Sequence, residues 1–204
     1  MRQLALSITA VSAVLLAQPC LAQMPAPIDG VEVETQAGTL LGSRENDVLV
    51  FRGVPYAAPP VGEYRWRPPQ PVEPWKGVRA ATAHEAPCTQ PVDTDTTVAN
   101  FGGVNGAQSE DCLYLTITAP EDAQGAPVLV WFHGGAFFLG SGSLGSYDGT
   151  ANAKRGIITV SVNYRLGALA NFVHPALNAE NPQEPKGNYA LQDSVAVLEW
   201  VRDN

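Results

Sequence analysis

Apolar residues occur along this sequence in short runs that are separated by glycine, proline and acidic residues. Alternating runs predict three small antiparallel strands near the start, and more solid apolar runs predict three further strands. Continuous runs such as 127–132 and 156–162 are typical of strands that are covered on both faces. The six predicted strands comprise residues 31–35, 38–43, 48–54, 113–118, 127–132 and 156–162.

A single convincing helix is predicted over residues 188–204. Leu191, Val195 and Leu198 recur there at helical spacing and form an apolar face, while the opposite face is charged and includes Asp193. The chain therefore begins with strands and continues as strand, loop, strand and helix. This order predicts the opening part of an α/β sheet.

Between the early strands and the later ones lies a proline-rich stretch, residues 54–75, that holds seven prolines. Proline lacks a backbone N–H and interrupts helices, so this stretch is predicted to be an ordered coil. The formal net charge of −8 argues against nucleic-acid partners and anionic membrane surfaces. Outside the N-terminus no apolar run reaches the ~18 residues of a membrane-spanning helix.

The first 22 residues have the pattern of a secretory signal peptide: a short basic start, an apolar stretch and small residues before a cut after Ala22. The alternative is a buried N-terminal helix. Export predicts a periplasmic or extracellular location and leaves two cysteines, Cys88 and Cys112, which usually pair in an oxidising compartment. Closing that loop of about 25 residues removes roughly 3 kcal/mol of unfolded-state entropy.

A glycine-rich loop at 133–145 contains the spacing G-x-G-x-x-G at Gly140, Gly142 and Gly145. A dinucleotide site would require a following helix and an acidic residue about 20 positions later, and no Asp or Glu occurs from 150 to 179. A phosphate-binding loop would require lysine where Ser146 stands. The sequence therefore argues against both kinds of nucleotide site in this loop.

A different interpretation starts at the His-Gly-Gly-Ala segment, residues 133–136, directly after a predicted strand. Glycine lets backbone N–H groups approach a ligand without a Cβ in the way. Acyl-transfer enzymes use such N–H donors to stabilise the oxygen that becomes negative in the tetrahedral state, and one donor is worth about 3 kcal/mol. The alternative is a plain glycine-rich turn.

Four ordered blocks of this sequence resemble the type B carboxylesterases, the family that also contains the cholinesterases. The resemblance extends from about residue 31 to residue 204 and is greatest to bacterial esterases. The blocks are FRGVPYAAPPVG at 51–62 with Arg65-Trp66 and Pro74-Trp75, SEDCLYL at 109–115, VWFHGGAF at 130–137, and NYRLG at 163–167 with GNYALQD at 187–193 and Trp200-Val201.

This resemblance implies an α/β-hydrolase fold, here the N-terminal part of its mixed sheet preceded by a small antiparallel sheet, and serine-dependent hydrolysis of a small-molecule ester without cofactor or metal. It implies that Gly135 and Ala136 supply oxyanion N–H groups and that Gly134 shapes the turn. Cys88 and Cys112 match the family's first disulfide. Two structural ion pairs of the family are matched by Arg65 with Glu110 and by Arg165 with Asp193.

The nucleophile elbow G-x-S-x-G of such enzymes does not occur in the sequence, and Ser143 comes closest to it. His84 and His174 are predicted to be surface residues, and in the family a histidine at the place of His133 is structural. We therefore expect residues 23–204 to be the N-terminal part of a carboxylesterase domain that stops before the elbow, and the chain alone to be inactive.

A second hypothesis is a non-catalytic binding or adhesion member of the same family. Cholinesterases carry a tryptophan in the loop between the two cysteines to bind quaternary ammonium. Here Phe101 is the only aromatic residue in that loop, which argues against a choline ester. Ester, amide and carbamate substrates are all compatible with the sequence.

Overall fold

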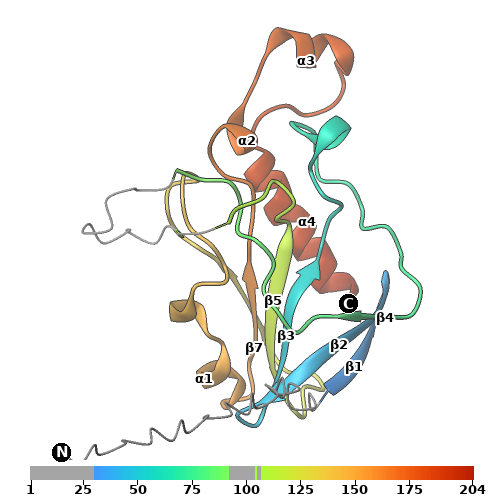
Figure 1. Cartoon of the computed structure of the whole chain (residues 1–204), viewed down its shortest axis with the longest axis vertical. Helices are drawn as coiled ribbons and strands as arrows, with labels where there is room; N and C mark the ends of the chain where they lie inside the picture. The colour runs from blue at the N-terminus through green and yellow to red at the C-terminus, as the bar shows by residue number, and fades with distance from the viewer. Residues whose placement is uncertain (1–29, 92–103, 105–106) are drawn as a thin grey trace, which may run out of the picture.

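A mixed sheet forms the centre of the computed structural model, which describes residues 30–91, 104 and 107–204 (Figure 1). Its strand order is β1-β2-β3-β5-β7-β6, with β4 beside β2. The predicted signal peptide and Phe101 lie outside the described residues. The strands are β1 (Gly30–Thr35), β2 (Gly38–Glu45), β3 (Val48–Pro55), β4 (Val78–Ala80), β5 (Tyr114–Pro120), β6 (Val128–Phe132) and β7 (Ile158–Val162).

All six predicted strands are present, and β4 is the one that the apolar pattern did not predict. The neighbours from β1 through β7 along the sheet pair antiparallel, whereas β6 pairs parallel with β7. The expected antiparallel group β1–β3 is continuous with the later strands through the β3–β5 pairing. The β6–β7 pair is joined by a crossover, as parallel neighbours require.

Four α-helices accompany the sheet in the described part of the chain. The predicted helix is present as α4 (Tyr189–Asp203), which lies against the sheet (Figure 1). The other three have only one or two turns, too few to leave a helical periodicity in the sequence. They are α1 (Thr150–Ala153), α2 (Gly167–Asn171) and α3 (Pro175–Glu180).

The orientation of α4 differs from the expectation. Asp193 on its charged face is fully buried, together with Val197. The apolar face points outward: Leu191, Val195 and Leu198 are 51–54% exposed. The inward side of the helix carries apolar residues of its own, among them Val197 and Trp200, which pack on the core around Asp193. The described residues include nothing that covers the apolar face.

The two strands that were expected to be covered on both faces also differ. β7 is almost wholly buried, which confirms the expectation for that strand. β6 is the last strand of the sheet and is half-exposed, so the expectation is wrong for β6 in the described structure. The loop that follows β6 therefore starts from an edge of the sheet.

The proline-rich stretch is the predicted coil, interrupted only by a 3₁₀ turn at Gly62–Tyr64. The hydrophobic core extends from the sheet to α4 and to the segment after β7. Among the described residues no helix has the length and apolarity to cross a membrane.

Candidate functional site

The segment after β6 makes a sharp turn with unusual backbone angles. Gly135, Ala136 and Phe137 have successive φ values of +116°, +54° and +59°. A Cβ on Gly135 would lie 1.9 Å from the backbone oxygen of Leu139, so only glycine fits there. The turn is closed by the N–H groups of Phe138 and Leu139, which donate to the Gly135 oxygen at 2.9 and 3.2 Å.

This turn leaves adjacent donors free. The N–H groups of Gly135 and Ala136 donate no hydrogen bond to any described residue. Gly135 is half-buried and Ala136 is exposed. Adjacent N–H groups in a turn of this kind form a concavity that favours an anion.

Gly134, which the resemblance implies shapes the turn, has an ordinary φ, and a Cβ on it would meet nothing within 4 Å in the described structure. The positive φ values of the turn lie at Gly135, Ala136 and Phe137, so the role of Gly134 in shaping the turn stays a prediction. The open space beside Gly134 lies on the same segment as the free donors. A side chain at position 134 would enter that space without disturbing the backbone.

His133 is held in place beside the turn. Its ring stacks on the Tyr164 ring with centroids 4.3 Å apart, and the Tyr164 hydroxyl donates to the His133 backbone oxygen. Its Nδ1 lies 2.8 Å from the Gly134 oxygen, which places the proton on Nδ1. Burial lowers the pKa of His133, so the imidazole is neutral at pH 7. These contacts make His133 a support of the loop.

Two side-chain amides form hydrogen bonds with residues 140–142 of the loop. The Gln90 Oε1 accepts from the Gly140 N–H at 2.9 Å, and its Nε2 donates to the Gly140 oxygen at 2.8 Å. The Asn163 Oδ1 accepts from the Gly142 N–H at 2.8 Å and from the Ser141 hydroxyl at 3.0 Å. Neither amide was singled out from the sequence. The available signals were the position of Gln90 two residues after a cysteine and that of Asn163 directly after a buried strand.

Two of the three glycines in the G-x-G-x-x-G pattern lie where a side chain would clash with neighbouring residues. A Cβ on Gly140 would lie 2.3 Å from the His133 Nδ1, and a Cβ on Gly142 would lie 2.6 Å from the Val162 backbone. At both positions the backbone of the loop packs directly against residues that hold the loop in place. Gly145, in contrast, has open space around it. The pattern therefore arises here from close packing of the loop against His133 and β7.

The disulfide predicted from the sequence is present between Cys88 and Cys112. Both cysteines are buried, and Cys112 lies just before β5. Next to it, the Arg65 guanidinium donates to both Glu110 carboxylate oxygens at 2.6 and 2.8 Å. This pair is largely exposed, and such pairs contribute little to stability.

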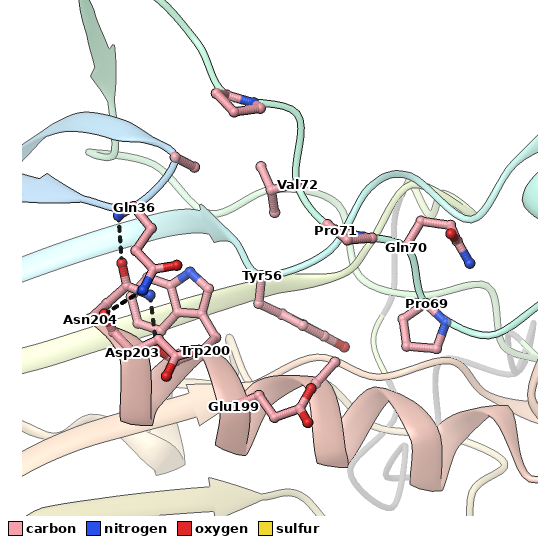
Figure 2. A pocket seen from close by; sticks show the side chains of 13 residues that line it. Gln36, Tyr56, Pro69, Gln70, Pro71, Val72, Glu199, Trp200, Asp203 and Asn204 are labelled. Carbon is pink, nitrogen blue, oxygen red and sulfur yellow. Dashed lines mark hydrogen bonds between the residues drawn. The ribbon is translucent and has the colours of Figure 1, made fainter.

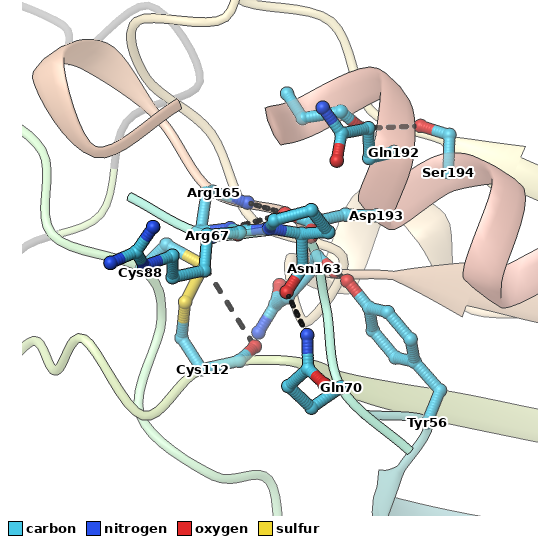
Figure 3. A network of polar contacts seen from close by, with 12 residues as sticks. Tyr56, Arg67, Gln70, Cys88, Cys112, Asn163, Arg165, Gln192, Asp193 and Ser194 are labelled. Carbon is cyan, nitrogen blue, oxygen red and sulfur yellow. Dashed lines mark hydrogen bonds and ion pairs between the residues drawn. A yellow bond between two sulfur atoms is a disulfide. The ribbon is translucent and has the colours of Figure 1, made fainter. Parts of the chain in front are cut away.

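The second ion pair is buried (Figure 3). Arg165 and Asp193 are 2% and 0% exposed, and Arg165 Nη2 lies 2.6 Å from Asp193 Oδ1. The backbone N–H and Nε of Arg165 also donate to the carboxylate, and Nη1 donates to the Arg67 oxygen at 2.7 Å. Burial raises the pKa of Asp193, and the hydrogen bonds from Arg165 oppose that rise. The pair fixes α4 to the segment after β7.

No serine of the described structure is paired with a histidine. Ser141 and Ser143 share a hydrogen bond of 2.7 Å between their hydroxyls. His84 is exposed and bonds the Thr116 hydroxyl, and the exposed His174 caps α3. These placements agree with surface positions for both histidines. Within the described ranges no three His, Cys, Asp or Glu side chains gather into a possible metal site.

A cavity of about 410 Å³ lies apart from this loop (Figure 2). It is bounded by the proline-rich coil, Tyr56 and the last turns of α4, with Trp200 and Glu199 on the helix side. None of its lining residues belongs to the segment 133–145. The free N–H donors are therefore not part of this cavity.

Comparison with known proteins identifies a family model and several relatives that match this chain. A family model described as the carboxylesterase family matches residues 29–204. The chain is 42% identical over 172 residues to the fumonisin B1 esterase of Sphingopyxis macrogoltabida, a match that covers 83% of this chain and 31% of that protein. It is 44% identical over 174 residues to the para-nitrobenzyl esterase of Bacillus subtilis (strain 168), covering 84% and 34%.

Solved structures agree with these relatives. A PNB esterase structure superposes with a TM-score of 0.74 at 43% identity and covers 85% of this chain and 35% of that one. A carboxylesterase of Geobacillus stearothermophilus gives a TM-score of 0.72 at 41% identity, covering 85% and 34%. The chain thus spans about a third of the length of the relatives that it matches. With α/β-hydrolase esterases as its structural neighbours, the chain belongs to the carboxylesterase family.

Proposed function

We propose that this chain supplies the oxyanion-binding part of a serine carboxylesterase. The observation that carries the proposal is the pair of adjacent N–H donors at Gly135 and Ala136, without partners among the described residues. They follow a strand of an α/β sheet, where α/β-hydrolases place part of their oxyanion hole. In the tetrahedral state of ester hydrolysis both donors would bind the negative oxygen.

The rigidity of the loop supports this role. Donors accelerate a reaction only if they already point to the place where charge develops, because reorganisation then costs nothing during the reaction. Here the turn is held by the His133–Tyr164 stack and by amide contacts at Gly140 and Gly142. Each donor is expected to lower the barrier by about 3 kcal/mol.

The nucleophile is proposed to lie in sequence beyond these 204 residues. No serine here has the elbow pattern, and none in the described ranges bonds a histidine. A serine would attack the ester carbonyl, a histidine would take its proton, and a carboxylate would orient that histidine. We propose a small-molecule ester as the substrate, and the 204 residues alone are expected to be inactive.

Export is part of the same proposal. Residues 1–22 are proposed to be a signal peptide that directs the protein to the periplasm or the medium. The buried disulfide between Cys88 and Cys112 supports an oxidising location, since such bonds are rare in the cytosol. Mass determination of the N-terminus of the exported protein tests the cut after Ala22.

The catalytic proposal is tested with a serine-reactive fluorophosphonate and a p-nitrophenyl ester. The gene product made by the natural source is expected to be labelled and to hydrolyse the ester, and the 204-residue chain is expected to do neither. Gly135→Ala keeps the N–H, but its Cβ would lie 1.9 Å from the Leu139 backbone oxygen, so the turn must shift and the donors are displaced. We expect kcat to fall by about 10²–10³, as when an oxyanion donor is lost. Gly145→Ala is the matched control that retains activity, because a Cβ at Gly145 meets open space and the position lies outside the turn that carries the donors.

The outcomes separate the hypotheses. Labelling of the purified 204-residue chain would contradict its expected inactivity. A folded natural gene product with no labelling and no hydrolysis would favour the non-catalytic binding hypothesis. Equal kcat values for Gly135→Ala and the unaltered protein would exclude this turn as the oxyanion site.

A further inference from the structure

Gln90 is joined to the loop by a reciprocal contact that resembles the pairing of two strands. Its carboxamide oxygen accepts from the Gly140 N–H at 2.9 Å while its carboxamide nitrogen donates to the Gly140 oxygen at 2.8 Å. The two residues lie 50 positions apart in the sequence, and the Gln90 side chain is buried. A side chain that satisfies both backbone groups of one residue defines the position and the orientation of that residue.

Gly140 in turn defines the position of the free donors. It follows Leu139, whose N–H closes the turn onto the Gly135 oxygen. Its Cα lies so close to His133 that a Cβ would be 2.3 Å from Nδ1, and His133 Nδ1 bonds the Gly134 oxygen. A shift of Gly140 would therefore reach Gly135 along the turn and through the His133 ring.

Gln90 is itself fixed relative to the sheet. Its Nε2 also donates to the Cys88 oxygen at 3.0 Å, and its backbone N–H donates to Gln108 Oε1 at 2.8 Å. Cys88 is bonded to Cys112, which lies just before β5. We call the two hydrogen bonds between the Gln90 side chain and Gly140 the Gln90 clamp. The clamp connects the loop after β6 to the segment before β5 through buried polar groups.

We propose that Gln90 is a positioning residue that holds the oxyanion donors in their productive geometry. The proposal rests on the function proposed above for Gly135 and Ala136. Gln90 does not contact the reacting atoms; it acts through Gly140. Its effect is expected on the turnover step, because misplaced donors weaken binding of the transition state more than binding of the ester.

The chemistry of the amide provides a sharp test. In Gln90→Glu the ionised carboxylate still accepts from the Gly140 N–H, but it can no longer donate to the Gly140 oxygen and instead repels it. Protonation restores a donor, and burial raises the pKa of such a carboxyl. The Glu variant should therefore recover the clamp as pH falls, which a loss of packing alone would not do.

The experiment uses the natural gene product and compares Gln90→Ala, Gln90→Glu and the control Gln192→Ala. Gln192 also donates a side-chain amide hydrogen bond to a backbone oxygen, that of Gly187, and forms no hydrogen bond to the described residues 133–145. Hydrogen–deuterium exchange is followed in the peptide 133–145 and in β7, and kcat and KM are measured for a p-nitrophenyl ester. All values are compared with the unaltered protein at the same pH.

For Gln90→Ala we expect at least tenfold faster exchange in 133–145, unchanged exchange in β7, and kcat lowered about 10- to 100-fold with little change in KM. Gln90→Glu should resemble it at pH 8 and approach the unaltered protein near pH 5. Gln192→Ala should change none of these values in the loop. Unchanged loop exchange in a folded Gln90→Ala protein would overturn the proposal.

The experiment separates failure of the Gln90 proposal from failure of the proposed function in two cases. If the unaltered protein shows no hydrolysis, the function is wrong, and the exchange data still decide whether Gln90 holds the loop. If Gln90→Ala does not fold, the pH dependence of Gln90→Glu decides, and absence of any recovery at low pH overturns the clamp.

Discussion

Replacing Asp193 by asparagine should strongly destabilise the protein, because it leaves the Arg165 charge buried without its counter-ion. The two side chains are 0% and 2% exposed. The carboxylate accepts from the backbone N–H, Nε and Nη2 of Arg165. After the substitution the guanidinium keeps the hydrogen bond to the Arg67 oxygen, the contact with the Tyr189 ring and a neutral acceptor in the Asn carboxamide oxygen. The carboxamide NH2 then faces Arg165 donors that a carboxylate oxygen accepted from before.

The magnitude follows from the burial. Removing one partner of a buried ion pair costs about 3–5 kcal/mol, and domains are stable by about 5–15 kcal/mol in total. The contacts that Arg165 retains favour the lower end of that range, about 3 kcal/mol. With a urea m-value of about 2 kcal/mol/M, the unfolding midpoint should fall by about 1.5 M.

Urea unfolding of the natural gene product, followed by tryptophan fluorescence, measures this change. Asp203→Asn is the matched control: its carboxylate pairs with Arg202 at the surface, and no measurable shift of the midpoint is expected. A double variant, Arg165→Met with Asp193→Leu, should recover much of the loss, since it removes the buried charge altogether. A midpoint shift below about 0.5 M for Asp193→Asn, or a double variant no better than the single one, would refute the reasoning.

Three further predictions concern other contacts. Reducing the disulfide should lower the free energy of unfolding by about 3 kcal/mol through loop entropy, measured as the difference in urea midpoint with and without dithiothreitol. Arg52 lowers the pKa of Glu45 from 4.5 to about 2, so the pair stabilises the protein above pH 4.5 and loses that effect as pH falls through about 2. Glu45→Gln should therefore have a lower urea midpoint than the unaltered protein at pH 7, and the difference should shrink as pH falls to about 2. Gly142→Ala should lower the melting temperature, because its Cβ would meet the Val162 backbone at 2.6 Å, whereas Gly145→Ala should not.

Much of the fold could be predicted from local patterns. The six strands were identified because runs of apolar residues at strand spacing reflect burial against a sheet, whichever strands become neighbours. β4 was missed because three residues, of which Val78 is exposed, leave no such run. The pairing of β3 with β5 and of β7 with β6 depends on contacts between distant segments, which no local pattern specifies.

The face of α4 shows where periodicity misleads. Leu191, Val195 and Leu198 predict the buried face, but Arg165 lies inside and requires a carboxylate beside it. The opposite side of the helix also has apolar residues, Val197, Trp200 and Val201, and these pack on the core. Asp193 lies on that side, so the helix buries these residues and the ion pair together.

The family, the disulfide and the location of the loop could be inferred from the sequence, since these follow from residue types in a fixed order. The close approach of Gly135 to the Leu139 backbone, and the hydrogen bonds of Gln90 and Asn163 to the loop, became visible only in the folded chain. The physical reason is that a positive φ, a close approach and a hydrogen bond between residues 50 positions apart are properties of packed geometry. A residue's type permits such contacts, and its neighbours in space select them.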